Sequence, residues 1–103
     1  MRPSTVNILG KDYSITYCNK PSDVDIDGHT ALWGQIDYWT NSIRIYSGRL
    51  DDEIFQNILH EIIHAIVKDL HINTVSDAKD EEDVVDLLAL GLADTLSRNG
   101  WMK

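Results

Sequence analysis

The hydrophobic periodicity of this chain changes once, midway along its length, and the change restricts the folds open to it. Residues 5–9 and 13–17 alternate apolar and polar side chains with a period of two, as half-buried strands do. Residues 32–39 and 42–46 repeat that alternation. After Gly48 the apolar residues recur every three to four positions, which is the spacing of one helix face. The sequence therefore predicts an α+β fold in which the strands precede the helices.

Turn-forming residues divide the first half of the chain into two hairpins. Residues 10–12 separate the first pair of alternating segments, and Thr40 and Asn41 separate the second pair. The intervening residues 19–30 are rich in Asp, Pro and Ser, so they are predicted to form a loop. We expect a small antiparallel or mixed sheet of three to four strands, with the strand at 42–46 at a sheet edge beside the following helix.

Two amphipathic helices are predicted in the second half. The first is expected over about residues 52–70, with an acidic first turn at the positive end of its dipole. Its apolar face contains isoleucines at successive i+4 steps, namely Ile54, Ile58, Ile62 and Ile66. The polar stretch 73–79 precedes a second, C-terminal helix, which Asn99 and Gly100 are expected to end. A chain of 103 residues suits one domain, so residues 1–103 are predicted to form a single one.

The charge of the chain argues against several classes of partner. The formal net charge is -8, and twelve of the seventeen acidic residues lie in residues 51–103. This excess repels phosphate groups, so neither nucleic acid nor an anionic membrane surface is an expected partner. No apolar run reaches the roughly 20 residues that cross a bilayer. Because Cys18 is a single cysteine and the N-terminal residues lack the apolar core of a secretion signal, the expected compartment is the cytoplasm.

A metal-binding pattern lies inside the first predicted helix. His60, Glu61 and His64 form an HExxH sequence, in which the two histidines are one helical turn apart on one face. Both imidazoles can reach one ion, and neutral imidazole nitrogen is a preferred ligand of zinc. The glutamate is offset so that it can take a proton from a water whose pKa the metal lowers. We therefore expect a zinc site at His60 and His64 with Glu61 as general base.

A catalytic zinc site needs a third protein ligand, and this sequence restricts the choice. The metzincin continuation requires Gly and His at positions that Val67 and Leu70 occupy. His71 follows too far along the helix axis to share the ion. The remaining source is a glutamate from the first turn of the second helix, and helical geometry leaves both Glu81 and Glu82 open.

The HExxH sequence and the second helix together resemble a known family. The combination is similar to ImmA/IrrE-type metallopeptidases and, more closely, to very small HExxH proteins of phages and prophages. The resemblance extends over roughly residues 43–100 and implies a minimal zincin-like fold of the gluzincin kind. It also implies zinc bound by His60, His64 and Glu82, with Glu61 as base. Two positions of the second helix depart from the family pattern, since Val85 replaces the usual Ala and Leu88 the usual Phe. The residues of the second helix that carry the resemblance are Glu82, Val85, Leu88, Ala89, Leu92 and Ala93.

These observations predict a zinc-dependent metallopeptidase that hydrolyses a peptide bond with a metal-activated water. The substrate is expected to be a protein or peptide, which the edge strand 42–46 would bind by β-augmentation. A cleft in so small a domain is shallow, which leaves room for a partner protein that completes it. The sequence does not rank the residues able to stabilise the oxyanion, which are Tyr38, Tyr46, His29 and His71.

The alternative is a non-catalytic metal-binding or protein-interaction module that retains the same helix pair. A structural zinc site is normally closed by four protein ligands and needs no base, so Glu61 favours catalysis.

Two other patterns are assigned structural roles. Residues 23–28 match the first half of an EF-hand loop, but Gly34 occupies the position of its essential Glu, so we predict a solvated turn. Trp33, Trp39 and Trp101 are expected in the core or on the sheet face. The first two are also close enough to the proposed sheet edge to line a substrate pocket.

Overall fold

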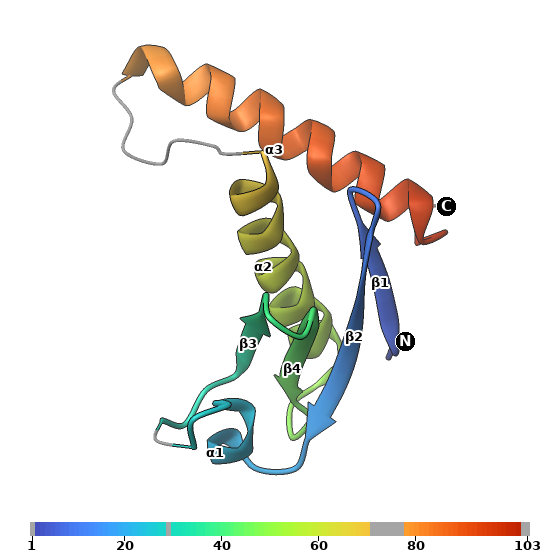
Figure 1. Ribbon diagram of the computed structural model, residues 1–103, viewed down its shortest axis with the longest axis vertical. Coiled ribbons are helices and arrows are strands. Elements are labelled where there is room, and N and C mark those ends of the chain that lie inside the picture. The colour runs from blue at the N-terminus through green and yellow to red at the C-terminus, as the bar shows by residue number, and fades with distance from the viewer. Residues whose placement is uncertain (1, 29, 71–77, 102–103) are drawn as a thin grey trace.

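The computed structural model describes residues 2–28, 30–70 and 78–101, and it does not describe the side chains of residues 78–83 and 85–87. The described residues form one four-stranded mixed sheet and three helices, which confirms the predicted α+β class (Figure 1). The strand order is β1-β2-β4-β3. The strands are β1 (Thr5–Ile8), β2 (Lys11–Cys18), β3 (Gly34–Asp37) and β4 (Ser42–Tyr46).

Both predicted hairpins are present. The strands β1 and β2 are antiparallel, and the turn between them contains Leu9 and Gly10, both with positive φ (51° and 92°). Two consecutive residues in this conformation match the right-handed twist of the flanking strands. In the second hairpin β3 and β4 are antiparallel, and Asn41 takes a φ of 50°. The Asp37 carboxylate accepts hydrogen bonds from the Trp39 N–H and the Thr40 hydroxyl, which stabilises this turn.

The prediction that residues 42–46 form a sheet edge is wrong. The strand β4 lies inside the sheet, because it pairs with β2 in parallel and with β3 in antiparallel fashion. Its side chains Ile43 and Ile45 are 0% exposed and belong to the hydrophobic core. The edge beside β4 is instead formed by β3, whose residues are all half-buried.

The predicted loop at 19–30 contains one turn of helix, α1 (Pro21–Val24). Pro21 starts it, at a position where the missing N–H is not needed. Val24 is fully buried, and α1 contacts β2 and β4. Residues 25–28 form a turn, in which the Asp25 carboxylate accepts hydrogen bonds from the backbone N–H groups of Asp27 and Thr30. The predicted solvated turn at 23–28 is thus confirmed only in part, because its first two residues are helical and Asp25 is buried.

The two long helices are α2 (Asp51–Asp69) and α3 (Ala78–Arg98). The first agrees with the predicted bounds to within one residue. The second begins inside the stretch predicted to be polar loop and ends where expected, with Gly100 at a φ of 67° just beyond it. In Figure 1, α2 lies against the sheet and α3 crosses the C-terminal end of α2.

The isoleucine stripe of α2 forms the centre of the core, as predicted. All four isoleucines are 0% exposed and pack on inward-facing side chains of the sheet. Gly91 of α3 lies so close to Ile66 that an added Cβ would be 2.6 Å from its Cγ2 atom, so the helix crossing depends on glycine. The sheet side chains in this cluster are Val6, Ile8, Tyr13, Ile15, Ile43 and Ile45.

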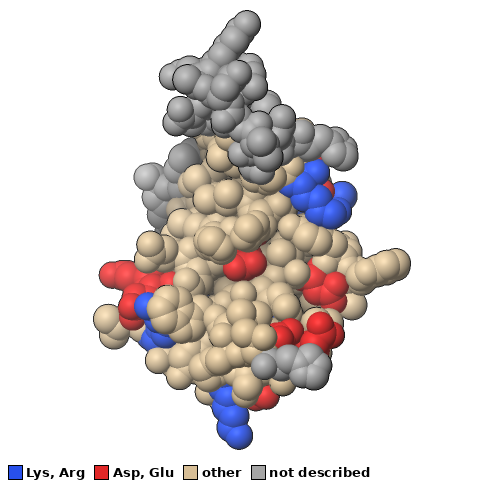
Figure 2. All heavy atoms as spheres, turned by 90° about the vertical axis from the view of Figure 1, so that its left-hand side faces the viewer, with Lys and Arg blue, Asp and Glu red and all other residues tan. Residues whose placement is uncertain are grey.

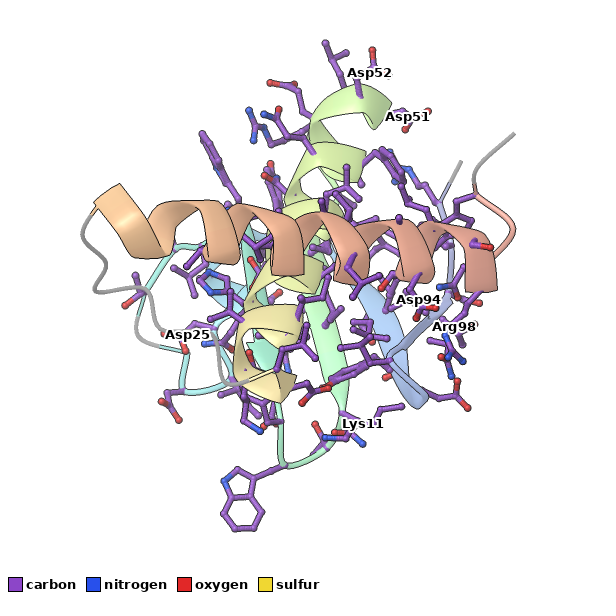
Figure 3. All side chains as sticks on the ribbon, turned by 90° about the horizontal axis from the view of Figure 1, so that it is seen from above. Lys11, Asp25, Asp51, Asp52, Asp94 and Arg98 are labelled. Atoms are coloured by element: carbon purple, nitrogen blue, oxygen red, sulfur yellow. The ribbon has the colours of Figure 1, made fainter. Side chains whose placement is uncertain are left out.

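The C-terminal end of α3 is tied to the outer strand β1. The Asn7 N–H donates to Asn99 Oδ1 at 2.8 Å, and Asn99 Nδ2 donates to the Asn7 carbonyl at 2.9 Å. One side chain thereby satisfies both polar groups that this residue of an edge strand presents outward. Figure 3 shows Asp94 and Arg98 side by side on α3 near this junction, and they form an ion pair of 2.6 Å.

Replacing Asn99 by alanine is expected to lower the free energy of unfolding by about 1–3 kcal/mol, because part-buried backbone groups of β1 lose their partner. Urea unfolding followed by circular dichroism measures the effect. The neighbouring Arg98→Ala substitution removes only an exposed ion pair and should change stability by less than about 1 kcal/mol. Equal effects of the two substitutions would contradict the prediction.

Three tyrosines are expected to make the fold sensitive to alkaline pH. Burial raises the pKa of Tyr13, Tyr17 and Tyr38 above the ordinary value of 10.0, and nearby Asp69 raises that of Tyr13 further. Their contribution to stability is therefore present below the unfolded-state pKa and is lost as the pH rises through the folded-state values. We expect the urea midpoint to fall as the pH rises above about 10, and to fall less in Tyr13→Phe. An identical pH profile for the variant would refute this role.

Candidate active site

The two histidines of the HExxH sequence lie together on the exposed side of α2. Their Nε2 atoms are 3.1 Å apart and their ring centroids 4.7 Å apart. Two nitrogens bound to one tetrahedral zinc at ordinary bond lengths are about 3.3 Å apart, so the pair fits a shared zinc ion with little movement. The structure confirms that the His60 and His64 side chains meet, as their i+4 spacing predicts, and this separation is compatible with two ligands of one tetrahedral ion.

Glu61 has a different environment from the two histidines. It is 6% exposed, whereas His60 and His64 are both exposed. Burial raises the pKa of the Glu61 carboxyl, while the neighbouring His60 and His64 imidazoles lower it by a smaller amount. The site thus combines an exposed pair of imidazole side chains with a buried carboxyl group.

The edge strand β3 passes directly beside the Glu61 carboxylate. A Cβ atom added to Gly34 would lie 3.0 Å from Glu61 Oε2 and 3.3 Å from Ile45 Cδ1. Only glycine leaves the carboxylate this much room. Gly34 was not expected from the sequence as a site residue, although a glycine within a strand pattern is a signal that another group approaches closely.

Replacing Gly34 by alanine is expected to shift the Glu61 carboxylate by a few tenths of an ångström and to slow any hydrolysis, by less than the roughly 100-fold that a 1 Å misplacement costs. Zinc affinity should change little, because the histidine ligands are on the exposed side of α2. Turnover and zinc content measured on the same preparation test this expectation. Unchanged turnover would show that the close approach does not position the carboxylate.

A cavity of about 450 Å³ opens beside these residues. Trp33 is 58% exposed there, and the Arg49 guanidinium lies 3.7 Å from the centre of its ring. Trp33 therefore does not lie in the core; it lines a pocket, which was the alternative role expected for it. The lining residues are Ala31, Leu32, Trp33, Gly34, Asn57, His60 and Glu61.

A second cavity of about 460 Å³ also includes residues of β3. Trp39 is 97% exposed at this place, so it also lies outside the core and lines a pocket, as the alternative expectation had it. Figure 2 looks onto the side of the molecule where β3 and α1 lie, and acidic side chains are scattered there among uncharged ones. The lining residues are Ile26, Gln35, Ile36, Asp37, Tyr38, Trp39 and Lys68.

The predicted third ligand belongs to α3. The backbone of Glu82, like that of Glu81, lies within that helix, but both side chains are outside the described part of the structure. Among the side chains that are described, no three His, Cys, Asp or Glu groups gather as a metal site. The assignment of Glu82 as the third ligand therefore stays a prediction.

The candidates for oxyanion stabilisation are only partly placed. His29 and His71 lie outside the described residues. Tyr46 has its hydroxyl against Gly48. Tyr38 lines the second cavity, and Glu61 is near enough to contribute to raising its pKa, after burial and Tyr13.

Comparison of this chain with protein-family models, with curated proteins and with solved structures found no match. The resemblance to small phage metallopeptidases consequently rests on the residues named above. Within the described residues, no helix has the length and apolar character needed to cross a membrane.

Proposed function

We propose that this protein is a zinc-dependent metallopeptidase. The observation that carries the proposal is the 3.1 Å separation of the His60 and His64 Nε2 atoms. Glu61 of the same helix is buried next to the edge strand β3. The proposal includes a zincin-like fold, a cytoplasmic location and kinship with small phage or prophage proteins.

The ligand set is His60, His64 and Glu82, with Glu81 as the alternative third ligand. A zinc ion bound there would polarise the scissile carbonyl group and lower the pKa of the attacking water. Glu61 is not a ligand. Its carboxylate takes the proton of that water and afterwards passes it to the leaving amine.

The free edge of β3 is an argument for a peptide substrate. Within the described sheet it pairs on one side only, with β4, and Gly34 brings its backbone next to the Glu61 carboxylate. An extended peptide added beside β3 would be held by main-chain hydrogen bonds close to the base. The sequence assigned this peptide-binding role to the strand at 42–46, but that strand is internal, so we assign the role to β3. A partner protein that completes the open cleft is consistent with the small size of the domain.

Zinc titration of the metal-free protein by calorimetry tests the first half of the proposal. We expect one zinc per chain for the wild type and for Lys68→Ala, a matched change of an exposed residue on the same helix. His60→Ala and His64→Ala should each lose this binding. If the wild type binds no zinc, the proposal is wrong.

Cleavage of a peptide library, followed by mass spectrometry, tests the second half. The zinc-loaded wild type should cut a subset of peptides that the His60→Ala protein leaves intact. Zinc binding without any cleavage would favour the alternative, a non-catalytic metal-binding or interaction module.

A further inference from the structure

Asn57 has a buried donor with no partner. It lies on α2 one turn before Glu61, and its Nδ2 atom is buried without a hydrogen-bond acceptor among the described residues. The same residue lines the cavity of about 450 Å³ that also contains Glu61 and His60. The unpaired amide and the metal-binding side chains thus belong to one pocket.

This arrangement is unfavourable for folding alone. A buried N–H group without an acceptor loses its hydrogen bond to water and gains nothing in return. Asparagine is also a poorer residue than leucine inside a helix. A leucine of similar shape at position 57 would remove both costs, so the fold does not explain the asparagine.

The pocket indicates the chemistry of the missing acceptor. Leu32 and Trp33 present apolar surface, so the ligand brings an apolar group. Glu61 provides a buried carboxyl beside it, which repels a negatively charged acceptor when ionised. A neutral carbonyl oxygen next to an apolar side chain meets both conditions, and a peptide backbone supplies this combination.

We propose that Asn57 is a substrate-binding residue that donates a hydrogen bond from Nδ2 to a backbone carbonyl of a peptide with an apolar side chain in this pocket. This inference rests on the proposed function, since it places the substrate beside Glu61. Asn57 positions the peptide and takes no part in proton transfer.

The first test needs no substrate. Asn57→Leu is expected to raise the melting temperature of the metal-free protein by about 4 °C or more, because it removes an unsatisfied donor. Gln56→Leu, an exposed amide on the same helix, controls for helix propensity and should shift it less. A lower melting temperature for Asn57→Leu, or failure to fold, would show a structural role and overturn the proposal.

The second test observes the donor directly. The side-chain N–H signals of Asn57, assigned through bonds in the ¹⁵N-labelled wild type, should move downfield when a blocked glycine–leucine–glycine tripeptide is added. The same peptide with aspartate in place of leucine should not move them. No movement with the leucine peptide, or equal movement with both, would overturn the proposal.

The two proposals fail in different ways. With any peptide that the protein cleaves, Asn57→Leu should raise KM about tenfold and leave kcat nearly unchanged. Hydrolysis with an unchanged KM would refute the role of Asn57 alone. The expected signal movement without zinc binding or hydrolysis would refute the peptidase, and would keep Asn57 as a peptide-binding group.

Discussion

A Glu61→Gln variant is expected to bind zinc as the wild type does and to hydrolyse peptides at least about 100-fold more slowly. Glutamine has the same shape, so it can fill the space that Gly34 leaves beside the side chain. It cannot accept the proton of the attacking water. Loss of turnover with retained metal would therefore identify the carboxylate as the base.

The measurement compares zinc content and kcat for the wild type, for Glu61→Gln and for a control. Glu53→Gln is the matched control, because it removes one acidic charge from the first turn of the same helix, where Glu53 pairs with Arg49. This control should retain most of the activity. Normal turnover in Glu61→Gln would exclude Glu61 as general base.

Glu82→Ala is expected to weaken zinc binding by more than about 100-fold. Mutating a residue that only hydrogen-bonds to a metal ligand costs about 10- to 100-fold, and losing a ligand should cost more. Two histidines alone leave the ion with half of a tetrahedral ligand set. Glu81→Ala changes the adjacent residue of the same helix turn and should leave zinc affinity nearly unchanged.

Calorimetric zinc titration of both variants distinguishes the three possible results. Loss of affinity only in Glu81→Ala would make Glu81 the third ligand. Unchanged affinity in both variants would mean that neither glutamate completes the site, and the gluzincin assignment would then be wrong.

Local patterns in the sequence predicted the elements of this fold well. The period of two located both hairpins, and the isoleucines at i+4 steps located α2 to within one residue and identified its buried face. The i+4 spacing of His60 and His64 also predicted that their side chains meet. Each of these features depends on residues that are close together in the chain, and periodicity reports such relations directly.

The arrangement of the elements was harder to predict. The sequence placed residues 42–46 at an edge, but the structure places β3 there and pairs β4 with β2. It also did not distinguish buried Glu61 from its exposed histidine neighbours, and it put Trp33 and Trp39 in the core or on the sheet face. These properties depend on which surfaces of distant segments meet.

The sequence alone determined the class of the fold, the two hairpins, the buried face of α2 and the juxtaposition of the HExxH histidines. Only the tertiary structure decided that β3 is the edge strand, that Gly34 makes room for Glu61 and that Asn57 has an unpaired donor in the same pocket. The physical reason is the range of the interactions. The alternation of a strand and the spacing of a helix depend on residues that are close together in the chain. Strand pairing, burial and hydrogen bonding depend on contacts between segments that are far apart in the chain.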